Sequence, residues 1–367
     1  MTDQLKKTPL YENHLALHAK MAPFGGFLMP IQYKSIIAEH KATRSGATLF
    51  DTCHMGEFTF SGPQSIVDLE KVLSCPVHSM EIGQCRYGFL LNEQGGVIDD
   101  QILYRKGDTS FFMVVNAATA DNDFAWISSH LSSETVAENI SEQTAKIDLQ
   151  GPSAPSIAHK FLEKPFDHLK FYRFMDNAYR GKPLLVSRTG YTGEIGFEFY
   201  GPPELLRTLW NDLLSAGVKP AGLGARDTLR LEMGYPLYGH ELDETTNAFW
   251  SGFSRAFGEH SFIGADAVDR TVAPEYRLSA LLIEGRRTTH PNDEIFAGDE
   301  NVGRVTSGSF SPSLGCAIAL GYLKNEFSEP DRTLTVQTDR GNLNASVTTL
   351  PFYRDATGRK KLADFLK

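Results

Sequence analysis

The chain has 367 residues, which at about 100–200 residues per domain corresponds to two or three domains. Its 36 basic and 45 acidic residues give a net charge of −9, which argues against a broad nucleic-acid-binding surface but allows a local basic pocket for a small anion. No apolar run approaches the roughly 18 residues of a membrane span, and the polar N-terminus lacks a signal-peptide core. The four scattered cysteines form no Cys-x-x-Cys pair, so we expect a cytoplasmic protein without disulfides or a metal site.

The first part of the chain alternates between helical and strand periodicity. We predict helices at 33–45, 64–73 and 121–130, and strands at 51–60, 87–91, 97–105, 111–115 and 146–150. Two adjacent glycines, Gly95 and Gly96, lie between apolar runs and allow positive φ at low cost. The stretch from 87 to 115 is therefore predicted to form an antiparallel meander.

The second part of the chain changes character after Pro274. Before it we predict helices at 153–161, 203–216 and 223–233, and strands at 184–189 and 196–200. After it only short strands are predicted, at 278–283, 304–306, 317–322, 333–337 and 343–348. The predicted fold class is α+β, with residues 1–270 forming a region of two lobes and residues 277–367 a β-barrel-like domain. The meander lobe is expected to span about 51–145.

Two pairs of adjacent residues carry groups that could do chemistry. Cys53 and His54 could form a nucleophile and base, but neighbours on the predicted 51–60 strand point to opposite faces, so a packed thiol beside a polar histidine is the better interpretation. Asp99 and Asp100 interrupt an apolar strand, and the same alternation places their carboxylates on opposite faces. They are therefore not expected to form a paired dyad. One is expected to face solvent or cap the turn, and the other to point under the sheet.

A glycine-rich loop and an arginine pair remain open to two interpretations each. Residues 190–198 hold three glycines and two acids, which either bring the backbone close to a planar ligand or make a tight turn between strands. Arg226 and Arg230 lie one helical turn apart near Asp227 and Glu232, which is typical of an internally paired face and less often of an anion clamp. No dinucleotide fingerprint or P-loop is present.

Taken together and in order, these segments resemble the aminomethyltransferase, or T-protein, family of the glycine cleavage system. The matching blocks are Phe24-Gly-Gly-Phe-Leu-Met-Pro30, Tyr33-Lys-Ser-Ile36, Phe50-Asp-Thr-Cys-His-Met-Gly-Glu57, 92–100, Val114-Val-Asn-Ala-Ala118, Leu149-Gln-Gly-Pro152, 187–198, 220–227, 235–244, 306–312 and Pro351-Phe-Tyr-Arg354. The resemblance covers nearly the whole chain. It implies a three-lobed α+β fold that binds tetrahydrofolate in a central channel.

The resemblance also implies a reaction and a set of site residues. The aminomethyl group on the lipoyl arm of the H-protein passes to tetrahydrofolate, with release of ammonia and 5,10-methylenetetrahydrofolate. The catalytic residue of the Gly-Gly-x-x-Asp-Asp block is the second acid, Asp100, which would orient the nucleophile and stabilise positive charge on the aminomethyl carbon. The residues implied to line the folate channel are Met55, Tyr87, Asn116, Tyr191, Glu198 and Arg226.

Two departures from the family pattern leave the substrate open. Cys53 stands where the family usually has serine, and residues 248–256 replace a segment that usually ends in Gly-Trp. If that tryptophan walls the channel, Trp250 could substitute only by a shift along the chain. The alternatives are a related folate-dependent demethylase that acts on a small methyl donor and a non-catalytic folate-binding factor.

Overall fold

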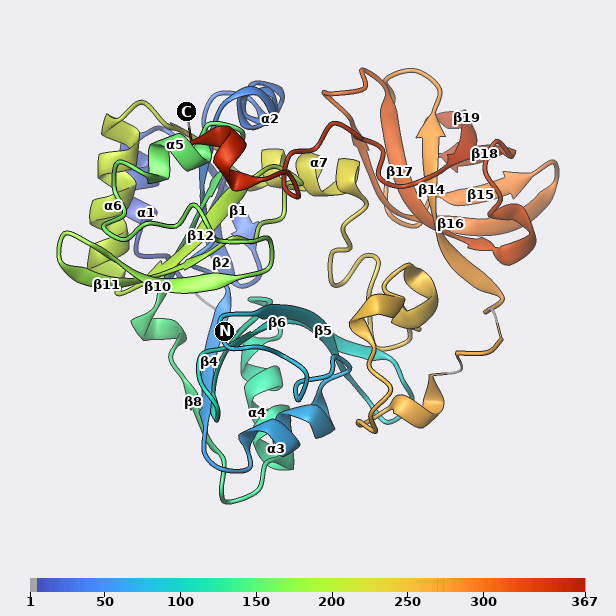
Figure 1. Cartoon of the computed structure of the whole chain (residues 1–367). Coiled ribbons are helices and arrows are strands. Elements are labelled where there is room, and N and C mark those ends of the chain that lie inside the picture. Colours follow the sequence, from blue (N-terminus) through green and yellow to red (C-terminus); the bar gives the residue numbers. More distant parts are fainter. Residues whose placement is uncertain (1–4, 269, 273, 367) are drawn as a thin grey trace.

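The computed structural model describes residues 5–268, 270–272 and 274–366. Figure 1 shows three lobes arranged around a common centre: two that combine a sheet with helices, and a barrel at the C-terminal side. The predicted α+β class with a C-terminal barrel is confirmed. Within the described ranges, none of the helices has both the length and the apolar character needed to span a membrane.

The first lobe is built on a sheet that the chain enters several times. Its strands, in spatial order, are β10 (Phe174–Tyr179), β11 (Lys182–Ser187), β12 (Gly196–Gly201), β9 (Ala145–Gln150), β3 (Thr48–Asp51) and β13 (Lys219–Pro220). The helices near it are α1 (Tyr11–Ala16), α2 (Ile36–Ser45), α5 (Ala154–Ala158) and α6 (Pro203–Ser215). The amphipathic α6 turns its buried face, centred on Trp210, toward β9 and β12, so this helix closes the core of the lobe.

The second lobe contains the predicted meander. Its strands, in spatial order, are β5 (Cys85–Leu91), β6 (Val97–Arg105), β7 (Ser110–Val115), β4 (Gly56–Ser61) and β8 (Val136–Asn139). The strands β5, β6 and β7 pair antiparallel in chain order, as the glycine turn at 95–96 predicts, and Gly95 has φ +79°. The helices α3 (Ser65–Val72) and α4 (Ala120–His130) contact each other, and η1 (Ser141–Gln143) follows β8.

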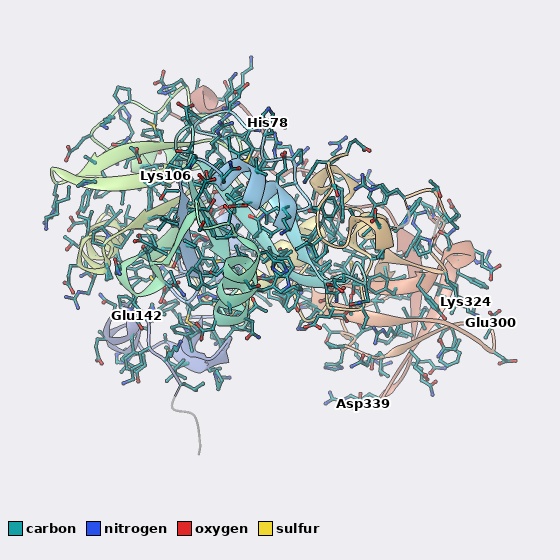
Figure 2. The ribbon with its side chains drawn as sticks, turned by 90° about the horizontal axis from the view of Figure 1, so that it is seen from below. His78, Lys106, Glu142, Glu300, Lys324 and Asp339 are labelled. Atoms are coloured by element: carbon teal, nitrogen blue, oxygen red, sulfur yellow. The ribbon has the colours of Figure 1, made fainter. Side chains whose placement is uncertain are left out.

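The third lobe is a closed barrel formed by the strands predicted after Pro274 together with one strand, at 294–297, that was not predicted. Around the barrel they are β14 (Tyr276–Ile283), β17 (Ala317–Lys324), β16 (Glu300–Phe310), β15 (Glu294–Ala297), β18 (Thr333–Thr338) and β19 (Gly341–Thr348), with η5 (Asn325–Phe327) after β17. Closure leaves no free sheet edge. Figure 2 shows Glu300 and Lys324 together on the outside of this barrel, where their side chains form an exposed ion pair of 2.6 Å.

Helix α7 (Leu223–Met233) joins the first lobe to the barrel. It contacts α2 on one side and β16 and β17 on the other, and it ends at Gly234, whose left-handed φ of +69° terminates the helix. Its Arg230 is buried and donates to Glu241 and to Ser307 of β16. The chain then runs along the second lobe through η2 (Ala248–Ser251), η3 (Ser254–Ala256) and η4 (Ala265–Ala267) before it enters the barrel (Figure 1).

The predicted strand at 51–60 is wrong, because it merges two strands of different lobes. Strand β3 ends at Asp51 in the first-lobe sheet and β4 begins at Gly56 in the second-lobe sheet. The residues between them, Thr52 to Met55, cross from one lobe to the other. Alternation of apolar and polar residues continues across this crossing, so sequence periodicity alone did not detect it.

A β-hairpin near the N-terminus was not predicted. It pairs β1 (Lys20–Phe24) with β2 (Phe27–Gln32) around Gly25 and Gly26, which both have positive φ. This glycine pair between two phenylalanines is the hairpin signal that could have found it. Pro23 and Pro30 break the strand pattern on either side, which hides the signal.

The C-terminal segment returns from the barrel to the first lobe, as the red trace in Figure 1 shows. Its backbone bonds to α7 and to the glycine-rich loop: Tyr353 N donates to Glu232 O over 3.0 Å, and Gly358 N to Gly193 O over 2.8 Å. The segment ends in η6 (Leu362–Phe365), which contacts α5. Residues 353–363 are thereby held beside the loop at 190–196.

Candidate active site

The first polar cluster of the candidate site lies at the end of the second-lobe sheet where β6 begins and β7 ends. Asn116 follows β7, and its amide Nδ2 donates to Asp99 Oδ1 over 2.7 Å and to Asp100 Oδ1 over 2.8 Å. Asp99 also accepts from Asn116 N and from Thr119 Oγ1, both over 2.9 Å, and is fully buried. One amide therefore holds two carboxylates together.

The predicted alternation of faces agrees with the burial along β6, where Asp99 is buried and Asp100 half-buried. The expectation that one of the two carboxylates faces solvent is wrong. The alternation also did not predict that a single residue beyond the end of β7 bonds both carboxylates. The β6–β7 pairing begins only at Ile102, so neither aspartate is fixed against β7 and both reach the Asn116 amide.

The pKa of Asp100 is raised to about 7, mainly by burial and then by the negative charge of Asp99. Tyr87 on β5 donates its hydroxyl to Asp100 Oδ2 over 3.0 Å, which partly offsets this rise. Burial and the charge of Asp100 in turn raise the pKa of Tyr87, so its hydroxyl keeps its proton. Asp100 is thus a carboxyl group fixed by two donors and poised to change charge near neutral pH.

A third carboxyl group, that of Asp123, interacts with the Asp99 carboxylate. Asp123 on α4 is fully buried, neither of its oxygens has a well-aligned hydrogen-bond partner in the described structure, and burial together with the charge of Asp99 raises its pKa to about 10. Asp123 is therefore neutral at pH 7. Burial also raises the pKa of Asp99, and the hydrogen bonds from Asn116 and Thr119 oppose that rise. Neither sequence periodicity nor spacing indicated Asp123.

A second cluster, of two cations and two carboxylates, lies on the first-lobe sheet and α7. Lys146 Nζ on β9 lies 3.0 Å from Asp148 Oδ1 and 2.8 Å from Glu198 Oε1 on β12. Arg226 on α7 donates to Asp148 Oδ2 over 2.8 Å. Burial alone would lower the pKa of Lys146, but the charges of Asp148 and Glu198 raise it. The cluster is charge-balanced, as a buried ionic group must be.

Glu198, which the resemblance places against the folate, is already held by protein donors. Its Oε2 accepts from Thr189 Oγ1 over 2.5 Å, from Tyr200 over 3.0 Å and from Tyr104 over 3.3 Å. Among the residues that the structure describes, its Oε1 contacts Lys146 alone. Since a carboxylate oxygen accepts about two hydrogen bonds, Oε1 retains one acceptor position.

Tyr191 lies between the two clusters. The guanidinium of Arg226 is 5.0 Å from its ring centroid, and the ring of Tyr235 stacks on it at 5.8 Å and 26°. The hydroxyl of Tyr191 donates to Pro236 O. Burial raises the pKa of Tyr191, and the charge of Asp100 adds to the rise, so the two clusters are electrostatic neighbours.

A cavity of about 430 Å³, a size typical of small-molecule sites, is lined by Gly190 and by Tyr235, the chain neighbour and the stacking partner of Tyr191. Its described lining residues include none of the seven residues predicted for the site. Its walls come from the first lobe, α7, the segment after it and the C-terminal segment; among them are Thr189, Gly190, Gly193, Tyr235, Phe253, Tyr353 and Arg359. Phe253 lies 6.3 Å from the ring of Tyr87, and Tyr87 in turn bonds Asp100. An aromatic contact thus connects the cavity wall to the carboxylate.

Part of the segment 248–256, which differs from the family pattern, forms a wall of this cavity. Phe253 lines the cavity together with Ser251 and Gly252. Trp250 lies in η2 with its ring 5.5 Å from that of Phe249. Within this segment, Phe253 is an aromatic residue that contacts Tyr87.

The structure supports one of the two interpretations of the glycine-rich loop. A Cβ on Gly190 would lie 2.2 Å from the Gln150 side chain, and Gly193 has φ +80° beside Met233, so close packing and turn geometry require these glycines. The same two glycines line the cavity, and the interpretation that the loop approaches a planar ligand stays a prediction.

Cys53 and His54 do not form a nucleophile and base. Burial and the charge of Asp51 raise the pKa of the Cys53 thiol well above its usual value, and burial lowers the pKa of His54 to about 4. The thiol donates to Lys146 O, and the His54 ring packs edge-on against Phe24 at 5.5 Å. Met55, next in the same crossing, packs against the core between the first two lobes.

The two arginines of α7 have separate partners. Arg226 belongs to the charge cluster beside Tyr191, whereas Arg230 bonds Asp227, Glu241 and Ser307. The internally paired interpretation therefore holds for Arg230.

The sequence analysis did not predict several residues of the site, because their positions depend on contacts between distant segments. These residues are Lys146, Asp148, Thr189, Tyr235 and Phe253.

Comparison with known proteins identifies the class of this fold. Residues 10–259 match the GCVT N-terminal domain, and residues 277–354 match the glycine cleavage T-protein C-terminal barrel domain. The aminomethyltransferase of Moorella thermoacetica is 41% identical over 360 residues, covering 95% of this chain and 98% of the relative. That of Chloroherpeton thalassium is 40% identical over 359 residues, covering 95% and 99%.

A solved structure agrees over the whole chain. The glycine cleavage system aminomethyltransferase T of Bartonella henselae superimposes with a TM-score of 0.91 at 31% identity, covering 96% of this chain and 99% of that one. The fold and these matches define an enzyme that transfers one-carbon groups. In particular, the chain belongs to the glycine cleavage T-protein family, the aminomethyltransferases.

Proposed function

We propose that this protein transfers the aminomethyl carbon from the lipoyl arm of the H-protein to tetrahydrofolate, releasing ammonia and 5,10-methylenetetrahydrofolate. The observation that supports this most is the half-buried Asp100, which Tyr87 and Asn116 hold, with Tyr87 in ring contact with Phe253 of the cavity wall. In the proposed reaction the carbon loses its bonds to sulfur and to the amine nitrogen and gains bonds to two folate nitrogens. The two protons of those nitrogens end on ammonia and on the thiol.

The residues around the cavity suit a flat, polar-edged substrate. Tyr235 and Phe253, which line the cavity, offer aromatic faces to the pterin and benzoyl rings, and Tyr191 stacks on Tyr235. The free acceptor position on Glu198 Oε1 suits an N–H of the amino-pyrimidine edge, and Arg226 supplies a donor fork for a carbonyl or anionic group. We assign Met55, Tyr87 and Asn116 to the same channel, with Tyr87 and Asn116 holding Asp100.

Asp100 would act by position and charge. As a carboxylate beside the folate nitrogens it would orient the attacking nitrogen and stabilise the iminium-like carbon, because charges attract strongly where water is excluded. Orientation of two reactants can contribute roughly 7–11 kcal/mol, whereas positioned proton transfer typically gives about 10²–10⁴-fold. Orientation of the two reactants is thus the larger contribution to the rate enhancement, and Asp100 assists this orientation.

The direct test is a transfer assay with aminomethylated H-protein and tetrahydrofolate. The proposal predicts ammonia and 5,10-methylenetetrahydrofolate in equal amounts, dependent on both partners. Absence of both products with partners that are active with another family member would contradict it. Such a result together with folate binding would favour the non-catalytic folate-binding factor.

A second candidate function follows from Phe253. Because the 248–256 segment departs from the family pattern and Phe253 lines the cavity, the donor could instead be a small methylated amine, as in related folate-dependent demethylases. Methyl transfer to tetrahydrofolate from such a donor, without any effect of H-protein, would favour this candidate.

We further place the protein in the cytoplasm. All four cysteines are free thiols in the structure: Cys53, Cys75, Cys85 and Cys316. Free thiols are expected in a reducing compartment. Loss of activity on export to an oxidising compartment, with retention in the cytosolic fraction, would agree with this location.

A further inference from the structure

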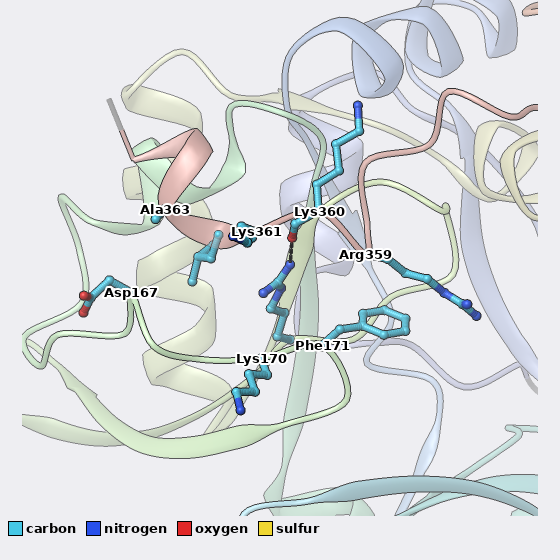
Figure 3. Close-up of a pocket in the computed structure, with 9 residues that line it drawn as sticks. Asp167, Lys170, Phe171, Arg359, Lys360, Lys361 and Ala363 are labelled. Carbon is cyan, nitrogen blue, oxygen red and sulfur yellow. Dashed lines mark hydrogen bonds between the residues drawn. The ribbon is translucent and has the colours of Figure 1, made fainter.

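Two segments from outside the second lobe reach the candidate active site. The C-terminal segment is held on the first lobe by Arg188, whose guanidinium donates to main-chain oxygens of that segment, including Lys360 O, as the dashed line in Figure 3 shows. The β1–β2 hairpin reaches the second lobe itself, because a Cβ on Gly25 would lie 3.0 Å from Ala117 Cβ. Figure 1 shows both of its strands on the side of the first lobe that faces the second. The hairpin tip therefore contacts the residue that follows Asn116.

The hairpin tip packs on a buried histidine. Phe24 and Phe27, which flank the glycine pair, lie edge-on to the ring of His54, with centroid distances of 5.5 Å and 6.4 Å. Burial lowers the pKa of His54 to about 4, so its ring is neutral at pH 7 and suits aromatic contacts. Since His54 belongs to the crossing between the first two lobes, this crossing holds the tip in place.

The loop at 116–119, which the tip contacts, is bonded to the aspartate pair. Asn116 donates to Asp99 through both N and Nδ2, and to Asp100 through Nδ2. Thr119 Oγ1 lies 2.9 Å from Asp99 Oδ2 and 3.2 Å from Asn116 O. A displacement of this loop would therefore move the amide that holds Asp100.

The two ends of this loop are packed closely against β4. A Cβ on Gly56 would lie 2.7 Å from Val115 Cγ2 and 2.7 Å from Ala120 Cβ, so both ends already contact the β4 backbone. A displacement of Ala117 would then be taken up between these ends, where the amide lies. Because Gly25 has no Cβ, the hairpin contacts Ala117 without displacing it.

We propose that Gly25 is a positioning residue for the transfer reaction: the hairpin tip holds the loop at 116–119 where the Asn116 amide meets Asp100. This inference rests on the proposed function, because it takes Asp100 as the group that acts on the folate nitrogens. Gly25 has φ +53° and Gly26 has φ +82°, so the turn favours glycine at both positions. A Cβ on Gly26, however, would meet nothing within 4 Å in the described structure. The two glycines therefore separate backbone strain in the turn from contact with the loop.

The experiment compares the wild type with Gly25→Ala, Gly26→Ala, Ala117→Gly and the double variant Gly25→Ala, Ala117→Gly. For each protein we would measure single-turnover formation of 5,10-methylenetetrahydrofolate, the Kd for tetrahydrofolate and the melting temperature. Both glycine variants place alanine at positive φ and should lose similar amounts of stability. Since a misplacement of about 1 Å can cost about 10²-fold in rate and the contact requires a smaller shift, Gly25→Ala should slow the transfer about three- to tenfold.

The expected result is a slower transfer in Gly25→Ala with a Kd within about twofold of the wild type, and an unchanged rate and Kd in Gly26→Ala. The double variant moves the methyl group from one side of the contact to the other, so its rate should return to within about twofold of the wild type. Ala117→Gly introduces no clash and, by loosening the loop, should slow the transfer about two- to threefold. It tests the contact even if Gly25→Ala does not fold.

Three results would overturn the proposal: equal slowing in Gly26→Ala, a double variant no faster than Gly25→Ala, or a wild-type rate in Gly25→Ala. If Gly25→Ala does not fold, a wild-type rate in Ala117→Gly would overturn it. Absence of transfer by the wild type, with partners that are active with another family member, would instead contradict the proposed function.

Discussion

Asn116 Nδ2 lies 2.8 Å from Asp100 and 2.7 Å from Asp99, so a single amide joins the carboxylates of two consecutive residues. Two like charges held this close oppose each other's ionisation. Burial raises the pKa of Asp99, and the further bonds that it accepts from Thr119 and from the Asn116 main chain oppose this rise. The pKa of Asp100 is raised to about 7, first by burial and then by the negative charge of Asp99.

The first prediction concerns the pH dependence of turnover. If the reaction needs the Asp100 carboxylate, kcat should fall as pH decreases through about 7, approaching about tenfold per pH unit well below it. The variant Asp99→Asn removes the like charge and should move this acid limb to lower pH, while burial keeps part of the rise. A pH–rate profile of both proteins measures the shift.

The control for this shift is Asp108→Asn, an exposed residue of the β6–β7 turn, which should leave the profile in place. An acid limb that stays unmoved in Asp99→Asn, or that moves to higher pH, would contradict the assignment of Asp99 as the neighbour that raises the Asp100 pKa.

A second prediction concerns the cavity wall. Phe253→Ala removes the ring that lies 6.3 Å from Tyr87 and should weaken tetrahydrofolate binding. An aromatic contact contributes about 0.5–1.5 kcal/mol, so the expected rise in Kd is about two- to tenfold. Phe253→Trp should keep the affinity of the wild type. Fluorescence or calorimetric titration gives the Kd, and an unchanged Kd in Phe253→Ala would mean that this ring does not meet the ligand.

A third prediction concerns stability. Arg230 is buried and pairs with the fully buried Glu241, so Arg230→Met should lower the free energy of unfolding by about 3–5 kcal/mol by leaving that carboxylate unpaired. Lys324→Met breaks the exposed pair with Glu300 that Figure 2 shows and should cost no more than about 1 kcal/mol. Urea unfolding of both variants tests this, and similar losses in the two would refute the claim that α7 is tied to the barrel by Arg230.

The sequence predicted those parts of the fold that depend on neighbours in the chain. Helix α7 and strand β6 lie at their predicted bounds, because apolar periodicity and the Gly95 turn are local signals. The 51–60 strand failed, because Thr52 to Met55 change sheets without a change in pattern. The β1–β2 hairpin was missed because prolines mask its glycine turn.

The site was less predictable than the fold, because its residues come from segments that lie far apart in the sequence. The resemblance supplied Asp100, Tyr87 and Asn116 as site residues, and the structure brings these three together. No local pattern could show that Lys146 meets Glu198, or that Asp123 stands behind Asp99, because these contacts join different elements. Burial alternates along β6 as predicted, but the alternation could not show that Asn116, beyond the end of β7, bonds both Asp99 and Asp100.

The most direct test is the variant Asp100→Asn, which keeps the shape of the side chain and removes its charge. Single-turnover formation of 5,10-methylenetetrahydrofolate from aminomethylated H-protein should slow by about 10²-fold or more, as expected for loss of a positioned charge in the transition state. The Kd for tetrahydrofolate should stay within about twofold of the wild type, because only the reacting state needs that charge. A rate equal to that of the wild type, or an equal loss in rate and in affinity, would contradict the role assigned to Asp100.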